Sequence, residues 1–266
     1  LAYIGPNPAI NGYVKSKGQA LRIVAGATSG GAGLVARKNA RLKTPADFHG
    51  RKMASPQLGN TQDVALRAWL RIQGLTPTDH GGDVQIIPVS NPDQLTLFLK
   101  NDIDAAWTVE PWISRLIREG NGILFLDERR LWPKGEFVTA HVIVSTAFLK
   151  RNRAIVKSWI RAHVELTQWI QAHPTEAKSL INDELKRLTG KRLPADVLDD
   201  AWKRLTITYD PIVDSLTQSA QSAFREGFLG NNPPDLPGIY DLSLLNEVLG
   251  ELGLAAIPQP TGRNTK

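Results

Sequence analysis

Residues 50–70 read GRKMASPQLGNTQDVALRAWL and combine a short apolar segment, a polar loop and an amphipathic segment. The apolar segment predicts a buried strand over 50–55, and the pattern then changes to the period of a helix over 61–73. Asn60 or Thr61 is expected to cap this helix, because a side-chain oxygen there accepts a hydrogen bond from a first-turn N–H group. A strand that leads directly into a helix is the repeating unit of an α/β fold. The residues expected on the buried face of the helix are Val64, Ala65, Ala68, Trp69 and Ile72.

The alternation of strand and helix extends in both directions from this stretch. Upstream, LAYIG at 1–5 predicts a short buried strand, and Pro6 then opens a helix that stops at Gly18. From Arg153 onward the chain is expected to be largely helical. Alternating strands and helices predict an α/β fold with mostly parallel sheets. The other expected elements are strands at 20–27, 83–90, 103–112 and 122–127, a helix at 91–102 and an extended segment at 137–149.

The composition excludes several classes of protein. With 42% apolar residues, the 266 residues are enough for one large domain or two lobes. The net charge is +6, but basic and acidic residues are interspersed, and no basic block alternates with aromatic residues as in a nucleic-acid groove. No nucleic-acid partner is therefore expected. No apolar run is long enough to span a bilayer, and the first residues lack the features of a signal peptide.

The sequence carries none of the short motifs that mark common catalytic or nucleotide-binding sites. It has no GxxxxGK[ST], HExxH, CxxC or GxSxG, and the glycines of GATSGGAGL at 26–34 lead into an extended segment, unlike a dinucleotide loop. The five histidines are scattered, and the absence of cysteine removes disulfides, thiolate metal sites and thiol nucleophiles. We therefore expect no metal, no cofactor and no catalytic activity.

Three predicted helix N-termini are candidates for ligand binding. They are the segments 5–9 (GPNPA), 58–63 (LGNTQD) and 110–112 (EPW), each of which follows a predicted strand. In an open α/β sheet, ligands bind beyond the carboxyl ends of the strands, where unpaired N–H groups and the helix dipole favour an anion. A plain helix cap is the commoner role of each such segment taken alone.

Five stretches, taken in order, resemble a known protein family. The resemblance is to the substrate-binding proteins of ABC importers for nitrate, taurine, bicarbonate and aliphatic sulfonates, and most of all to the aliphatic-sulfonate branch. It extends over nearly the whole chain. The stretches are AYIGPNPAI at 2–10, VAGATSGGAGLVAR at 24–37, GRKMASPQLGNTQDVALRAWL at 50–70, NPDQLTLFLKNDIDAAWTVEPW at 91–112 and FVTAHVIVSTAFL at 137–149.

The resemblance implies a type II periplasmic-binding fold, in which two α/β lobes clamp a ligand in the cleft between them. Lobe II would comprise 34–139, and lobe I would comprise 1–33 and 140–266. The two crossovers between the lobes would lie near 29–36 and 137–143. Family members have a strand, a helix and another strand before the segment that matches LAYIG. We therefore expect lobe I to lack its N-terminal strand-helix-strand unit, which would leave the first strand at an exposed edge.

The resemblance also implies where the ligand binds. Pro6 and Asn7 would face the cleft, and the loop that includes Asn60 and Gln62 would present amides and hydroxyls to an oxyanion. Some family members have hydroxyl or imidazole side chains at the positions of Asn60 and Gln62, so the resemblance leaves the identity of the anion open. The complete expected set is Pro6, Asn7, Ser29, Gly30, Gly31, Gln57, Gly59, Asn60, Thr61, Gln62, Glu110, Trp112 and His141.

Four of the aromatic and titratable residues have two possible roles. Glu110 either contacts the ligand or is a structural carboxylate that caps the next helix. His141 either binds the anion or is a buried imidazole with its hydrogen bonds satisfied. Trp107 and Trp112 either form an apolar wall for the tail of a ligand or belong to the core.

The function implied by the resemblance is capture of a small anion, without chemistry, and its delivery to an ABC permease with its ATPase. The protein would be a monomer at the periplasmic or cell-surface side of the membrane. Three alternatives stay open: a binder of a thiamine-precursor pyrimidine, an enzyme on the same fold, and the sensing domain of a transcriptional regulator. The absence of cysteine argues against a sulfinate desulfinase with a cysteine nucleophile, and the helical C-terminal third is longer than the sensing domain of a regulator is expected to need.

Overall fold

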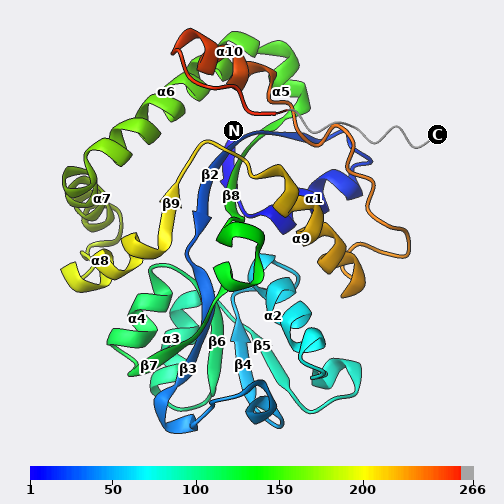
Figure 1. Cartoon of the computed structure of the whole chain (residues 1–266), viewed down its shortest axis with the longest axis vertical. Helices are drawn as coiled ribbons and strands as arrows, with labels where there is room; N and C mark the ends of the chain where they lie inside the picture. The colour runs from blue at the N-terminus through cyan, green and yellow to red at the C-terminus, as the bar shows by residue number, and fades with distance from the viewer. Residues whose placement is uncertain (259–266) are drawn as a thin grey trace.

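The computed structural model describes residues 1–258, and the strands form two separate sheets. Figure 1 shows the sheets one above the other along the longest axis of the molecule, and we call them the upper sheet and the lower sheet after these places. The upper sheet has the strand order β1 (Ala2–Ile4), β8 (Val138–Ser145), β2 (Leu21–Gly30) and β9 (Leu205–Ile207). The lower sheet has the order β5 (Gln85–Pro88), β4 (Lys52–Ser55), β6 (Ala105–Val109), β3 (Ala32–Arg37) and β7 (Gly122–Asp127).

Helices surround both sheets, and the predicted α/β class is confirmed. The N-terminal half contains α1 (Pro6–Lys15), α2 (Thr61–Ile72), α3 (Asn91–Leu99) and α4 (Trp112–Arg118). The C-terminal half contains α5 (Thr146–Arg151), α6 (Arg153–Ala172), α7 (Pro174–Thr189), α8 (Ala195–Arg204), α9 (Val213–Arg225) and α10 (Ser243–Glu251). Short 3-10 turns lie at Lys38–Ala40, Pro45–Phe48, Thr78–His80, Glu128–Leu131 and Pro133–Gly135. None of the helices in residues 1–258 combines the length and the apolar content that a membrane span requires.

Most strand pairings in the described chain are antiparallel, so the predicted predominance of parallel pairing is wrong. Among the pairings between named strands of the described chain, only those of β4 with β5 and with β6 are parallel. These three strands are joined through α2 and α3, and parallel neighbours require such crossover connections. The chain instead descends from β2 into β3 and returns upward through β7, so β3 and β7 run in opposite directions.

The first strand lies at the edge of the upper sheet and is not buried as predicted. β1 pairs with β8 alone, and its edge position agrees with the expectation of an open edge. Tyr3 is 56% exposed and Leu1 is 41% exposed. An edge strand has a neighbour on one side only, so its apolar side chains have less of the molecule to pack against.

The chain passes between the two sheets at two places. β2 continues into β3 through Gly30 and Gly31, whose φ angles are 72° and 68°, a region that favours glycine. The return from β7 to β8 runs through the turns Glu128–Leu131 and Pro133–Gly135, before the predicted crossover at 137–143. The return passage therefore lies earlier in the chain than 137–143, because Val138–Ser145 already pairs with β2 as a strand of the upper sheet.

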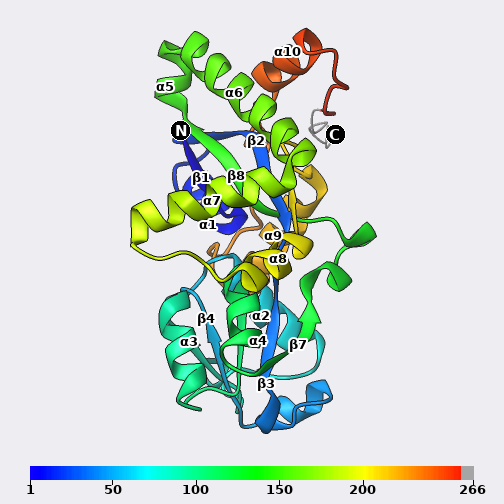
Figure 2. The ribbon, with the colours of Figure 1, turned by 90° about the vertical axis from the view of Figure 1, so that its left-hand side faces the viewer.

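Separate cores support the two sheets. One apolar cluster packs α1, α6, α9 and α10 against the upper sheet, and two clusters cover the two faces of the lower sheet. Two C-terminal helices leave the upper part and reach the lower one: α8 contacts α4, and α9 contacts α2 (Figures 1 and 2). The two parts are therefore joined by packed helices as well as by the two passages of the chain.

Candidate functional site

The N-termini of α1 and α2 meet between the two sheets. The backbone N–H of Asn7 donates to Thr61 Oγ1 at 3.3 Å, across 54 positions of sequence. A Cβ atom added at Gly5 would lie 2.8 Å from the same oxygen, so a larger residue there would force the Thr61 side chain or its neighbours to shift. Two of the three helix N-termini expected to bind ligand are thus brought into contact.

Asn7 is the main donor at the start of α1. It lies between Pro6 and Pro8, which have no N–H group to offer. Its side chain is buried, with 2% of the residue exposed, and its Nδ2 atom has no hydrogen-bond partner within the described residues. A buried polar group without a partner is uncommon and is a sign of an absent water, ion or ligand.

The start of α2 combines a helix cap with two unused donors. Asn60 Oδ1 accepts the N–H of Asp63 at 3.0 Å, so Asn60 is the predicted N-cap residue. The N–H groups of Thr61 and Gln62, like all N–H groups in the first turn, have no acceptor within the helix. Thr61 and Gln62 are nevertheless 9% and 8% exposed. We call Asn7, Thr61 and Gln62 the helix junction.

A buried carboxylate fixes the loop that precedes α2. Asp63 accepts hydrogen bonds from Ser55 Oγ at 2.6 Å and from the N–H of Gly59 at 2.9 Å. Arg67 donates to Asp63 and pairs with Asp79 as well, so this cation is fully engaged. Asp63 was not among the predicted site residues, and Ser55, eight positions before it, was the one local signal of this bond.

The other residues predicted in this loop have structural roles. The N–H of Gly59 is used by Asp63, and a Cβ at Gly59 would lie 3.0 Å from the Phe228 ring. Gln57 is exposed at the start of the loop. Thr61 and Gln62 differ from these residues in being nearly buried while their first-turn N–H groups lack an acceptor within the helix.

A second group of predicted residues gathers around the end of α8 and not at the junction. Cβ atoms at Gly30 and Gly31 would lie 2.6 Å from the Arg204 carbonyl oxygen and 2.4 Å from Leu205 Cδ2. Because these glycines have no Cβ atom, the end of α8 and the start of β9 can pack directly against the passage between the sheets. Ser29 is buried beside them and pairs with β8 and β9 through its backbone.

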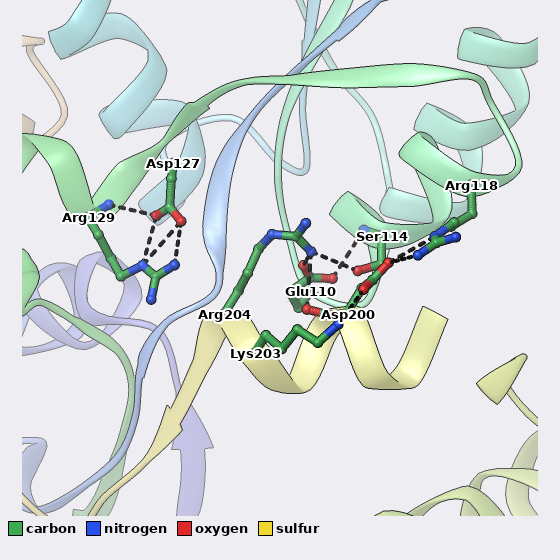
Figure 3. A network of polar contacts seen from close by, with 8 residues as sticks. All are labelled: Glu110, Ser114, Arg118, Asp127, Arg129, Asp200, Lys203 and Arg204. Atoms are coloured by element: carbon green, nitrogen blue, oxygen red, sulfur yellow. Dashed lines mark hydrogen bonds and ion pairs between the residues drawn. The ribbon is translucent and has the colours of Figure 1, made fainter. Parts of the chain in front are cut away.

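Glu110 has the structural role that was its second possibility. Its Oε2 accepts the N–H of Ser114 in α4 at 3.1 Å, and its Oε1 accepts from Arg204 Nη1 at 2.8 Å (Figure 3). No part of the Glu110 side chain is exposed, and burial raises the pKa of this carboxyl above its usual value. Both carboxylate oxygens accept bonds within the protein, which favours the structural role, and contact of Glu110 with a ligand stays a prediction.

His141 is buried and uncharged at neutral pH. Its Nε2 lies 3.1 Å from the Pro211 carbonyl oxygen, and its Nδ1 has no partner within residues 1–258. Burial lowers the pKa of His141 from 6.5 to about 4. The imidazole therefore supplies no positive charge for an anion at neutral pH. Only one of its two ring nitrogens has a hydrogen-bond partner within residues 1–258.

The two tryptophans differ in their surroundings. Trp107 is fully buried in the lower core and donates from Nε1 to Glu128 Oε2 at 2.8 Å, so it is a core residue and not a ligand wall. Trp112 is half-buried, and the guanidinium carbon of Arg115 lies 4.7 Å from its ring centroid. Among the described residues, no hydrogen bond joins either indole to the helix junction.

The donors at the junction are uncharged amides and hydroxyls, a kind of donor that suits an anion. Residues 1–258 contain no group of three or more side chains arranged to hold a metal ion. Arg67 is neutralised by two aspartates, and the junction offers amide and hydroxyl donors at two helix N-termini. Such donors favour negative charge through the aligned peptide dipoles.

Comparison with known sequences gives a family and two relatives. A profile of the NMT1-like family matches residues 2–182. The nitrate/nitrite binding protein NrtA of Nostoc sp. (strain PCC 7120) is 27% identical over 135 residues, which are 50% of this chain and 29% of that protein. The taurine-binding periplasmic protein of Escherichia coli K12 is 24% identical over 141 residues, which are 53% of this chain and 41% of that protein. The aligned parts therefore span less than half of either relative.

Solved structures share the fold. The periplasmic nitrate-binding protein NrtA from Synechocystis PCC 6803 superposes with a TM-score of 0.75 and 19% identity, over 94% of this chain and 74% of that one. The alkanesulfonate-binding protein SsuA from Xanthomonas axonopodis pv. citri, bound to MOPS, gives 0.71 and 17%, over 89% and 78%. The desulfurization enzyme DSZB gives 0.63 and 19%, over 94% and 85%, so the fold also carries an enzyme. The predicted resemblance and fold are confirmed.

Proposed function

The chain belongs to the NMT1-like family, and on that premise we propose that it is the solute-binding component of an ABC importer for a small oxyanion. The names of its relatives support this class of ligand, since they bind nitrate or nitrite and taurine. An aliphatic sulfonate, taurine or nitrate is therefore the proposed solute. The closed form would deliver it to the permease at the periplasmic or cell-surface side of the membrane, and the protein would act as a monomer.

The single observation that carries this proposal is the unpartnered amide of Asn7 at the helix junction. A buried Nδ2 group without an acceptor is costly unless an acceptor is supplied from outside the protein. An oxyanion oxygen supplies that acceptor. The unused N–H groups of Thr61 and Gln62 lie at the opposite helix N-terminus and supply further donors.

The number of donors is sufficient for useful affinity. A hydrogen bond to a charged acceptor contributes about 1.5–3 kcal/mol. Micromolar affinity corresponds to about 8 kcal/mol, and association itself costs several kcal/mol. Four or five such bonds therefore support micromolar binding, which requires the donors of α1 and α2 to act together.

The proposed mechanism is closure of two lobes on the anion. Lobe I would comprise 1–33 and 140–266, and lobe II would comprise 34–139. Asn7 belongs to the first of these and Thr61 to the second, so bonds from one anion to both residues would draw the lobes together. Binding would thus favour the closed conformation by its differential affinity for it.

Isothermal titration calorimetry with a panel of anions tests this function. The panel contains methanesulfonate, taurine, nitrate, sulfate and bicarbonate, with dimethyl sulfone as an uncharged relative of methanesulfonate. We expect saturable one-to-one binding of at least one monovalent oxyanion and none of dimethyl sulfone. Absence of binding by every anion, for a chain that melts cooperatively, would overturn the proposal.

A further inference from the structure

Helix α8 is bonded to the lower part of the molecule although it leads into a strand of the upper sheet. Arg204, its last residue, donates to Glu110 Oε1 at 2.8 Å and to Ser114 Oγ at 3.1 Å (Figure 3). Arg204 is followed at once by β9, which pairs with β2 of the upper sheet. The Glu110–Arg204 pair therefore joins elements that belong to different sheets.

A second ion pair lies beside the first along the same two helices. Arg118 of α4 pairs with Asp200 of α8 (Figure 3), and its Nη1 lies 3.6 Å from Asp196. Asp200 also accepts from Lys203 at 3.1 Å, but this bond stays within α8. Separation of α4 from α8 would break the bonds of Arg118 and would leave the bond of Lys203 intact.

The two pairs differ in burial and therefore in strength. The Glu110 side chain is fully buried and that of Arg204 is 21% exposed, whereas Arg118 is 46% exposed. Loss of the partner of a buried charge is strongly unfavourable, because the remaining charge lacks both water and counter-ion. An exposed pair contributes much less, about a 1.4-fold to fivefold change in an equilibrium constant.

The opposite side of the molecule carries a related contact. Arg71 of α2 pairs with Glu226, at the end of α9, at 2.8 Å, and the side chain of Glu226 is nearly buried. The guanidinium carbon of Arg67 lies 5.8 Å from the centroid of the Phe228 ring. This contact flanks the helix junction itself, so the α4–α8 contact is the better place to test opening without touching the junction.

We propose that the Glu110–Arg204 and Arg118–Asp200 pairs form a latch that holds the two lobes closed in the absence of ligand. The latch sets the equilibrium between closed and open forms, and release of a bound solute requires that it open. Only this last consequence rests on the proposed function; the closed-to-open equilibrium of the free protein does not. Arg204 and Arg118 are positioning residues, because they act on the junction through the relative placement of the lobes.

Distance measurement between two spin labels tests the latch in the full chain. The sequence contains no cysteine, so Lys100→Cys after α3 and Lys186→Cys on α7 are labelled without background. Both positions are exposed, and the helices α3 and α7 lie on opposite sides of the α4–α8 contact (Figure 1). The unliganded parent is expected to give one dominant distance by double electron–electron resonance.

Three variants on this labelled background decide the question. Arg204→Gln is expected to add a second, longer distance, with the open-to-closed ratio raised about tenfold, and Arg118→Gln is expected to raise it about 1.4-fold to fivefold. Lys203→Gln is the matched control, because it removes another positive partner of Asp200 that does not bridge the helices, and it is expected to leave the distances unchanged. If Arg204→Gln fails to melt cooperatively, the comparison of Arg118→Gln with Lys203→Gln decides alone.

The outcomes separate the latch from the proposed function. Unchanged distances in both Arg204→Gln and Arg118→Gln would overturn the latch, as would an equal change in Lys203→Gln. These results do not depend on any ligand. If methanesulfonate, taurine and nitrate all fail to bind while the variants open, the latch stands and the proposed function fails.

Discussion

The backbone N–H of Asn7 donates to the hydroxyl oxygen of Thr61 at 3.3 Å and thereby joins the first turn of α1 to the first turn of α2. This one bond brings together two parts of the chain that follow strands of different sheets. It also orients the Thr61 hydroxyl, which accepts from Asn7 and keeps its own proton free to donate. The proposed capture of an anion depends on this geometry.

Replacement of Thr61 by valine tests the contribution of the hydroxyl. Valine keeps the branched shape and removes the oxygen, so both the bond from Asn7 and one donor to the anion are lost. We expect the affinity for the bound anion to fall about tenfold or more, since a bond to a charged acceptor contributes about 1.5–3 kcal/mol. Calorimetric titration of Thr61→Val beside the parent measures the change.

Gln57→Ala is the control for that variant. Gln57 precedes α2 in the same loop but is exposed, so its replacement should leave the affinity unchanged. Equal losses in Thr61→Val and Gln57→Ala, or no loss in either, would remove Thr61 from the site.

Two buried groups are expected to give opposite dependences of stability on pH. Burial raises the pKa of Glu128 from 4.5 to about 7, so its contribution to the free energy of unfolding falls as pH rises through this interval. Burial lowers the pKa of His141 from 6.5 to about 4, so its contribution falls as pH decreases. Each difference corresponds to about 3 kcal/mol, and the two nearly cancel between pH 4.5 and 6.5.

Single variants should separate these contributions. Relative to the parent, Glu128→Gln should become more stable as pH rises from 4.5 to 6.5, and His141→Leu should become less stable over the same interval. Urea unfolding of the three proteins at several pH values measures the differences. A pH profile of Glu128→Gln parallel to that of the parent would show that this carboxyl ionises normally in the folded state.

Gly31→Ala tests the close approach at the first passage between the sheets. A Cβ atom there would lie 2.4 Å from Leu205 Cδ2, and the φ angle of 68° is unfavourable for alanine as well. Gly50→Ala is the matched control, because its φ is 69° but nothing lies within 4 Å of the added atom. We expect Gly31→Ala to be less stable than Gly50→Ala by about 1–3 kcal/mol. Equal melting temperatures of the two variants would argue that Leu205 moves aside freely.

Local sequence signals predicted the elements around the junction with good accuracy. The helix expected over 61–73 is observed as Thr61–Ile72, with Asn60 as its cap, because capping and helical periodicity depend on neighbouring residues. The predicted role of Pro6 at the start of α1 is confirmed for the same reason. The helix placed at 91–102 ends at Leu99, three residues early.

Contacts between distant segments could not be read from the sequence. Arg204 lies 94 positions from Glu110, and neither residue alone indicates the other, so Glu110 was assigned to a ligand as readily as to a cap. Pairing direction was missed in the same way, because β3 and β8 are placed by the passages between sheets and not by local pattern. Among the residues predicted to bind the ligand, Asn7, Thr61 and Gln62 therefore lie at the helix junction, whereas Gly30, Gly31 and Glu110 pack against the end of α8 and the start of β9.

The most direct test of the account follows the Asn7 amide while an anion is added. In a ¹⁵N-labelled sample, the side-chain NH₂ resonances of Asn7 and the backbone amides of Thr61 and Gln62 are assigned and then titrated with methanesulfonate, taurine or nitrate. We predict saturable shifts of these resonances, with the Asn7 NH₂ signals among the largest, because Nδ2 gains an acceptor that it lacks in the free protein. Saturable binding that leaves the Asn7 NH₂ signals unmoved would contradict the central claim and place the anion elsewhere.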